Sequence, residues 1–345
     1  MKRHGNLFNQ IIDPNNIYVA YRNARKGKGW RKEVKAFESN LNENLLYIQK
    51  ILCTKQFNTS SYRVKTIYEP KQRDIYILPF FPDRIVQHAL LQVLIPIWDN
   101  LLIYDTFACR TGKGMHEASR RTMGHVRSYN YCLKCDIRKF YPSIDHEILM
   151  SLVKKKIKCK DTIALIQNIV YSFDGGKNTP IGNYTSQWFG NIYMNEIDQR
   201  IKHVHKIKAY IRYSDDMILF SNDKALLHNI KNDIYLFLQD KLKLTFSKWS
   251  IFPVSQGVDF LGYRHFREKV LLRKSTAKRM IKRMRCLPKR LNDGKITIDQ
   301  FRGSVASTTG WIKWANTYNL SIAIGLKKLQ EVLHDRLSEV HKQHG

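Results

Sequence analysis

Residues 209–220 read Ala209-Tyr210-Ile211-Arg212-Tyr213-Ser214-Asp215-Asp216-Met217-Ile218-Leu219-Phe220. Two short apolar segments flank a polar tripeptide, which predicts two strands joined by a tight turn that carries Asp215 and Asp216. Adjacent carboxylates raise each other's pKa unless a cation lies between them, so the pair predicts a bound divalent metal. Aspartates are also common in turns, and on these residues alone a plain hairpin end is an equal alternative.

A third acid lies at the end of another predicted strand. Residues 131–137 are mostly apolar and end in Asp136-Ile137. Together with the Asp215 pair, Asp136 would complete a ligand set for two metals, which stabilise the attacking and leaving oxygens in phosphoryl transfer. Hard oxygen ligands favour Mg²⁺ over zinc. The three acids therefore predict a magnesium-dependent reaction at phosphorus.

The rest of the chain mixes predicted strands and helices. Two strands are expected at 62–68 and 75–78, joined by a hairpin around 71–74. Because the elements do not follow a strict β-α-β repeat, the pattern predicts an α+β fold, with a sheet that has helices on one face. Helices are expected through much of 1–60 apart from a Gly-rich basic loop at 26–32, at 83–98, 145–157, 161–172, 185–206 and 223–241, and through the tail 269–345.

Positive charge dominates the composition. The 345 residues include 59 Lys and Arg against 29 Asp and Glu, a formal net charge of +30. Such a chain attracts polyanions, so nucleic acid is the favoured partner, and a charge that only keeps the protein soluble is the alternative. Ten cations and no acid lie between Lys269 and Arg290, and this charge shift near 268 is the expected subdomain boundary. With 43% hydrophobic residues, the chain is not a disordered one.

Cysteines and apolar segments exclude other classes. Six cysteines scattered over the chain do not form a disulfide framework. Cys132 and Cys135 have zinc-like spacing, but residues three apart in a strand point to opposite faces. No apolar run reaches the length needed to span a bilayer, and the N-terminus lacks the apolar segment of a secretory signal. We therefore expect a cytoplasmic protein with no membrane partner.

Six segments, in order along the chain, resemble the reverse transcriptase family, and most closely the reverse transcriptases of diversity-generating retroelements. Any one segment occurs by chance, but their order is specific. Ile181 and Gly182 stand where most members carry Gln-Gly, and this form marks the diversity-generating branch. The segments are Tyr68–Arg73, Asp83–Leu90, Phe107–Gly114, Lys134–Asp145, Ile181–Gln187 and Tyr213–Asp216, and Phe260–Tyr263 resembles the segment before the thumb.

The resemblance implies a right-hand polymerase fold of fingers, palm and thumb, in which helices back an antiparallel palm sheet. Residues 1–268 would form the fingers and palm, and 269–345 a basic helical thumb that grips the template–primer duplex. The palm would hold two Mg²⁺ ions, for which Mn²⁺ can substitute. The metal ligands would be Asp136, Asp215, Asp216 and the main chain of Ile137.

The resemblance also implies roles for residues outside the metal site. Lys71 and Arg73 would bind the incoming triphosphate, where arginine offers two parallel hydrogen bonds to phosphate. Tyr141 would exclude a 2′-hydroxyl, so that deoxynucleotides enter. The remaining nucleotide-binding residues would be Ile181, Gly182 and Gln187. Arg84 would bind template or form a structural ion pair, and the thumb contacts would come from Lys274, Lys278, Arg279, Lys282 and Arg283.

The expected activity is error-prone, RNA-directed DNA synthesis in which a template RNA of a diversity-generating retroelement is copied into cDNA. The implied partners are template RNA, the RNA/DNA duplex, deoxynucleoside triphosphates and a small basic accessory protein of the same element. One alternative is a reverse transcriptase of another bacterial lineage, such as a retron or an antiviral system. Another is a non-catalytic RNA-binding protein with a polymerase fold, against which the intact acids at 136, 215 and 216 argue.

Overall fold

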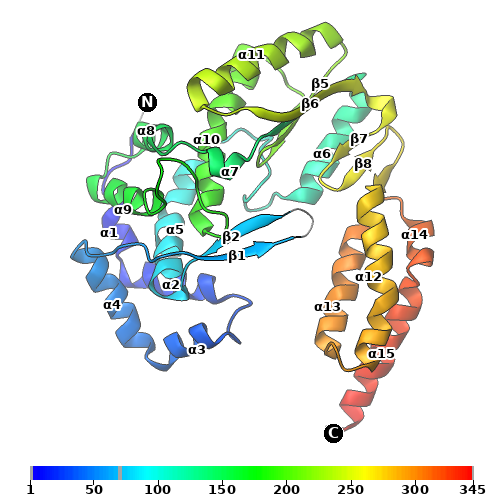
Figure 1. The fold of residues 1–345 in the computed structure, drawn as a ribbon, viewed down its shortest axis with the longest axis horizontal. Helices are drawn as coiled ribbons and strands as arrows, with labels where there is room; N and C mark the ends of the chain where they lie inside the picture. Colours follow the sequence, from blue (N-terminus) through cyan, green and yellow to red (C-terminus); the bar gives the residue numbers. More distant parts are fainter. Residues whose placement is uncertain (1–2, 69–71, 344–345) are drawn as a thin grey trace. The chain divides into compact units, whose positions relative to one another are not determined.

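A computed structural model describes residues 3–68 and 72–343 of the chain, with side chains as far as His334. The chain divides into two compact units, each built from separate chain segments (Figure 1). The first unit contains Met1–Gly114, Leu133–Leu219 and Ala225–Ser250, and the second contains Met115–Cys132, Phe220–Lys224 and Ile251–Gly345. No helix of the described residues is both long enough and apolar enough to cross a membrane.

The N-terminal part of the first unit is helical and carries one hairpin. Asp13 caps α2 by accepting hydrogen bonds from the Asn15 and Asn16 amides, and Pro14 occupies the first helical position. Strands β1 (Arg63–Ile67) and β2 (Arg73–Ile77) pair antiparallel. The helices are α1 (Phe8–Ile11), α2 (Pro14–Arg25), α3 (Lys32–Ser39), α4 (Leu41–Cys53) and α5 (Ile85–Asp99).

A four-stranded sheet contains the strands on either side of the acidic turn. Its order is β4 (Tyr210–Tyr213), β5 (Asp216–Ser221), β3 (Tyr131–Ile137) and β6 (Phe246–Pro253). Strands β4 and β5 are antiparallel and almost completely buried, as their apolar sequences require. Helices accompany the sheet, in agreement with the predicted α+β class (Figure 1). They are α7 (Phe140–Ser143), α8 (His146–Lys156), α9 (Lys160–Val170), α10 (Tyr184–Gln199) and α11 (Lys224–Leu242).

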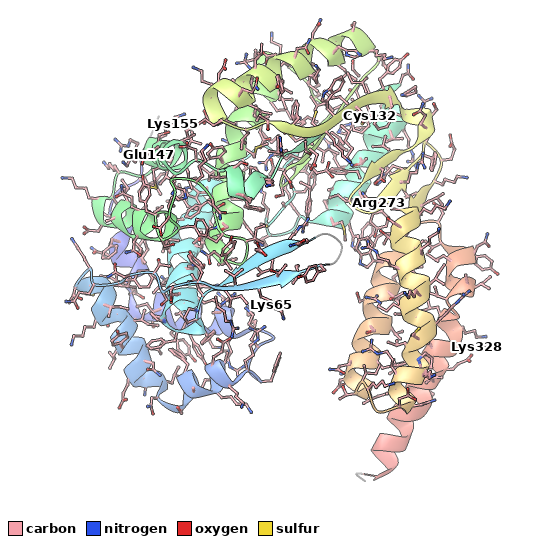
Figure 2. The ribbon with its side chains drawn as sticks, in the orientation of Figure 1. Lys65, Cys132, Glu147, Lys155, Arg273 and Lys328 are labelled. Atoms are coloured by element: carbon pink, nitrogen blue, oxygen red, sulfur yellow. The ribbon has the colours of Figure 1, made fainter. Side chains whose placement is uncertain are left out.

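The second unit combines a small sheet with helices. Strands β7 (Val258–Phe260), β8 (Tyr263–His265) and β9 (Val270–Leu272) form an antiparallel sheet. Thr297 and Gln300 form a reciprocal cap at the start of α13. Figure 2 shows Arg273 where α12 begins and Lys328 on α15. The helices are α6 (Met115–Ser128), α12 (Lys274–Asn292), α13 (Ile298–Ile312), α14 (Tyr318–Ala323) and α15 (Leu326–Gln343).

Most of the predicted elements are confirmed, and three expectations need correction. The tail expected to be helical from 269 begins with the strand β9, and its first helix starts at Lys274. The helix expected over 185–206 ends as α10 at Gln199, and one wider turn continues to Val204. The amphipathic helix expected at 83–98 is present, as a wider turn over Phe80–Arg84 that leads directly into α5, but α5 is largely buried.

Candidate active site

The acidic turn is a two-residue hairpin loop. Tyr213 and Asp216 pair across β4 and β5, which leaves Ser214 and Asp215 as the loop. Ser214 has a φ of 57°, the left-handed conformation that tight hairpin turns require at their first central position. The turn therefore presents the Asp215 side chain at the tip of two buried strands.

A buried ion pair lies beneath this turn. The Arg212 guanidinium donates to the Asp198 carboxylate of α10, with an Nη2–Oδ2 distance of 2.6 Å and both side chains fully buried. Tyr210 donates to the same carboxylate at 2.7 Å. Arg212 Nη1 also donates to the Ser214 carbonyl at 2.9 Å. The ion pair thus fixes the backbone of the loop to a buried helix.

The carboxylates of Asp215 and Asp136 lie close enough to affect each other. Burial raises the pKa of Asp215, and the charge of Asp136 raises it further. The charge of Arg73 on β2 and a hydrogen bond from Ser214 act in the opposite direction. A divalent cation between the two carboxylates would relieve the repulsion that raises this pKa.

Asp136 has a partner that the sequence did not reveal. Ser247 on β6 donates its hydroxyl to Asp136 Oδ2 at 2.5 Å, and the same hydroxyl lies 3.2 Å from the Asp136 carbonyl oxygen. This contact orients the carboxylate on the neighbouring strand. Strand β6 was not predicted, and a serine in an exposed polar segment gave no signal for this role.

Asp216 differs from the other two acids. Its Oδ1 lies 3.7 Å from the Lys134 Nζ on β3. Within the part of the chain that the structure describes, no group of three or more His, Cys, Asp or Glu side chains is arranged to hold a metal ion. Asp136 and Asp215 are the two carboxylates that could hold a hard divalent cation together, and their role, like that of Asp216 as a third ligand, stays a prediction.

Tyr141 contacts the acidic turn. Its hydroxyl lies 3.2 Å from the Ser214 hydroxyl, and its ring is half-buried, whereas the ring of Phe140 is buried. Burial raises the pKa of the Tyr141 hydroxyl. Gly190 on α10 makes room for both rings, because a Cβ there would lie 3.0 Å from the Phe140 ring and 3.2 Å from the Tyr141 ring. Tyr141 is thus held next to the loop that carries Asp215.

Gly182 is required by a backbone contact with the β1–β2 hairpin. Its φ is 128°, and a Cβ would lie 2.1 Å from the Tyr76 carbonyl oxygen. The Tyr76 amide donates to the Ile181 carbonyl at 2.7 Å. In this structure, the segment that Gly182 approaches is β2, and its predicted role in nucleotide binding stays a prediction.

The remaining predicted nucleotide and nucleic-acid residues fall into separate groups. Arg84, Tyr141, Ile181, Gly182 and Gln187 line one cavity of about 350 Å³. Arg73 is exposed on β2, and Lys71 lies outside the described residues. The predicted thumb cations lie on α12 in the second unit, where all are exposed and Arg283 donates to Thr308. They are Lys274, Lys278, Arg279, Lys282 and Arg283.

Residues 69–265 match the family model described as reverse transcriptase (RNA-dependent DNA polymerase). This match covers more than half of the chain, and the chain belongs to the reverse transcriptase family.

Several proteins of known sequence are similar to this chain. Protein YkfC of Escherichia coli is 24% identical over 56% of this chain and 63% of its own length. Group II intron-encoded protein LtrA of Lactococcus lactis is 23% identical over 74% of this chain and 56% of its own length. Nuclear intron maturase 1 of Arabidopsis thaliana is 24% identical over 32% of this chain and 14% of its own length. The chain therefore spans less than two thirds of each of these relatives.

Proposed function

We propose that this chain is an RNA-directed DNA polymerase, with its active site at the Ser214–Asp215 loop. The observation that carries the proposal is the convergence of the Asp136 and Asp215 carboxylates beside the ring of Tyr141. Carboxylates define a place for metal ions, and the ring defines a place for the sugar of an incoming nucleotide. Family membership supports the same chemistry.

Two Mg²⁺ ions fit this donor set, with Mn²⁺ as a substitute. Asp136 and Asp215 would hold them, with the Ile137 carbonyl and Asp216 as further ligands. When bound, the ions would stabilise charge on the attacking and leaving oxygens of nucleotidyl transfer. Ser247 keeps the Asp136 carboxylate oriented, and the Arg212–Asp198 pair keeps the loop in place, so the chain itself supplies a rigid frame.

Other residues would bind and select the substrates. Lys71 and Arg73 would neutralise the triphosphate, and the Tyr141 ring would clash with a 2′-hydroxyl. Ile181, Gly182 and Gln187 would line the nucleotide site. The exposed cations of α12 would bind the backbone of the RNA/DNA duplex, so that 269–345 acts as a thumb and 1–268 as fingers and palm.

We propose further that the enzyme serves a diversity-generating retroelement. The form Ile181–Gln187 supports this branch. The partners would be a template RNA and a small basic accessory protein of the same element, and the cDNA would be error-prone. A retron or antiviral reverse transcriptase is the alternative within the family. The neighbouring genes distinguish the two, because a template repeat beside a variable target gene would identify a diversity-generating retroelement.

Primer extension tests the polymerase proposal. Purified protein is given an RNA template, a DNA primer and deoxynucleotides, with and without Mg²⁺, alone and with the accessory protein. We expect extension that requires the metal and stops in Asp215→Asn. If the wild-type chain binds RNA but extends no primer under any of these conditions, it is an RNA-binding protein and not a polymerase.

A further inference from the structure

The β1–β2 hairpin depends on contacts at its base for its position. It forms a separate two-stranded sheet that extends away from the helices of the first unit (Figure 1). Every residue of the two strands is exposed or only half-buried. Because an isolated two-stranded hairpin is marginally stable at best, the base contacts decide how firmly Arg73, on β2, is held.

Aromatic rings and one main-chain hydrogen bond make the first part of this anchor. The Tyr76 amide donates to the Ile181 carbonyl at 2.7 Å. The ring of Tyr76 meets those of Tyr62 and Phe173 edge on, with centroids 6.0 Å and 5.2 Å away and both interplanar angles at 87°. These contacts place the base of the hairpin against the loop that precedes α10.

A directed chain of hydrogen bonds makes the second part, and it passes through the hydroxyl of Tyr62, the residue directly before β1. The Asn183 side-chain amide donates to this hydroxyl at 2.8 Å. The Tyr62 and Ser172 hydroxyls lie 2.8 Å apart, and Ser172 donates its one proton to the Ile169 carbonyl at 2.7 Å. Tyr62 must therefore donate to Ser172. Burial raises the pKa of the Tyr62 hydroxyl, so it keeps the proton that this chain needs.

Asn183 makes this contact in place of its usual role at a helix end. It is the N-cap residue of α10, where an asparagine side chain ordinarily accepts a hydrogen bond from the first turn, yet it makes no such bond. The Tyr184 amide of that turn donates instead to the Gln87 side chain at 3.0 Å. Asn183 is 5% exposed, so loss of the Tyr62 hydroxyl would leave a buried N–H without its acceptor.

The helix that anchors the hairpin also anchors the loop that carries Asp215. Asp198, near the end of α10, pairs with Arg212 beneath that loop. The hairpin and the acidic loop are therefore both attached to α10, at opposite ends of the helix. Burial raises the pKa of Asp215 and the charge of Arg73 lowers it, so Arg73 lies near enough for the two charges to interact. The place of Arg73 relative to the acidic loop thus depends on the base of the hairpin.

We propose that Tyr62 and Asn183 are positioning residues whose hydrogen bond holds the β1–β2 hairpin, and with it Arg73, where the triphosphate binds. The inference rests on the proposed polymerase function, and it adds two residues that act through the hairpin and not on the reacting atoms. A site that is in place for only a fraction of the time binds its ligand more weakly by that fraction. Weakening the anchor should therefore raise the KM for deoxynucleotides and leave kcat at saturating nucleotide unchanged.

Primer extension with varied deoxynucleotide concentration tests these roles. Tyr62→Phe keeps the ring and removes only the hydroxyl, and Asn183→Ala removes the donor. Each should raise the KM for deoxynucleotides by roughly 2- to 13-fold, the effect of one hydrogen bond, with kcat and template affinity at the wild-type values. The double variant should be no worse than either single one, because both changes remove the same bond. Tyr21→Phe is the matched control, since it removes a hydroxyl that donates to Glu38 at 2.6 Å elsewhere in the first unit, and its KM should not change.

The decisive result is coupling to Arg73. In the Arg73→Gln background, which lacks the positioned group, Tyr62→Phe should raise the KM little further. Hydrogen exchange of the Tyr76 amide, which donates to Ile181, should be faster in Tyr62→Phe than in the wild type or in Tyr21→Phe. The inference is overturned if Tyr62→Phe keeps the wild-type KM, leaves this exchange unchanged, or has its full effect in the Arg73→Gln background. If the wild-type chain extends no primer, the polymerase proposal fails and this inference with it, whereas an active wild type beside an unaffected Tyr62→Phe removes the positioning role alone.

Discussion

Arg212 and Asp198 form an ion pair from which water is fully excluded, directly beneath the loop that carries Asp215. Desolvating two charges is expensive, and the pair is satisfied only because Tyr210, Thr106 and Asn191 supply further hydrogen bonds. Removing one partner leaves the other charge buried and alone. The stability of the sheet and the geometry of the active-site loop therefore both depend on this ion pair.

Asp198→Ala should accordingly destabilise the protein by about 3–5 kcal/mol, because Arg212 would remain buried without its counter-charge. Denaturant unfolding at constant pH measures this change. Asp299→Ala is the matched control, since Asp299 pairs with Arg302 at the surface and its loss should cost about 1 kcal/mol or less. Equal destabilisation in the two variants would show that the buried pair contributes no more than an exposed one.

Asp215→Asn should abolish DNA synthesis and leave RNA binding nearly intact. The change removes a metal ligand but keeps the basic surface that attracts nucleic acid. Extension rates and RNA affinity are measured on the same protein. Asp216→Asn is measured in the same assays, because Asp216 lies near Lys134 and its part in metal binding is a separate prediction. Wild-type extension by Asp215→Asn would remove the metal site from this loop.

Tyr141→Ala should raise the incorporation of ribonucleotides relative to deoxynucleotides, because it removes the ring that blocks the 2′-hydroxyl. Single-turnover extension with each nucleotide gives the ratio. Tyr141→Phe keeps the ring and removes only the interaction between the Tyr141 and Ser214 hydroxyls, so its ratio should stay at the wild-type value. If the alanine variant also keeps that ratio, the selective residue lies elsewhere, with Phe140 the next candidate.

The sequence predicted those parts of the active site that lie at the ends of strands with a recognisable run of apolar residues. The strands at 131–137 and 209–220 have clear apolar runs, so Asp136 and the Asp215 turn could be placed at strand ends. Ser247 could not be found in this way. Strand β6 has four consecutive exposed residues at Ser247–Ser250 and thus no alternation, and its pairing with β3 is long-range.

Two other features also escaped sequence reasoning because they are set by tertiary contacts. Asp198 and Arg212 lie on different elements, and nothing in their local sequence marks them as a pair. The second unit collects Met115–Cys132, Phe220–Lys224 and Ile251–Gly345, and nothing in the sequence indicated that these separate segments pack together. The composition of the sequence shows where cations are frequent, but the two compact units are determined by which chain segments pack against each other.

The cations of α12 should contribute directly to the salt dependence of nucleic-acid binding. Lys278 and Lys282 are exposed one turn apart on the helix, away from buried Met280 and Met284. Replacing both with Gln should flatten the slope of log K against log salt by about 0.7–0.9 for each phosphate that is no longer neutralised. Lys327→Gln with Lys328→Gln removes the same charge from exposed positions of α15. If both double variants change the slope equally, α12 has no special role.

Ile181 should lower the fidelity of synthesis, most of all opposite template adenine. It lines the cavity beside Tyr141 and Gly182, and its carbonyl accepts a hydrogen bond from the Tyr76 amide, so its position is fixed by β2. Most members of the family carry Gln here, whose amide can hydrogen-bond near the sugar of the nucleotide, whereas the Ile side chain cannot. The missing bond is worth roughly 0.5–1.5 kcal/mol, which is about 2- to 13-fold in discrimination. Other residues must therefore contribute to strong mutagenesis, and the adenine preference itself rests on the family resemblance.

The test for Ile181 is the error spectrum of cDNA made on one RNA template. Ile181→Gln should make fewer errors opposite adenine while overall synthesis is retained, because the added amide holds the correct nucleotide in register. Ile181→Leu is the matched control, since it keeps an apolar side chain of the same size at the same backbone position and should leave the spectrum unchanged. If the Gln variant has the wild-type spectrum, Ile181 acts through packing against the cavity wall and has no part in nucleotide selection.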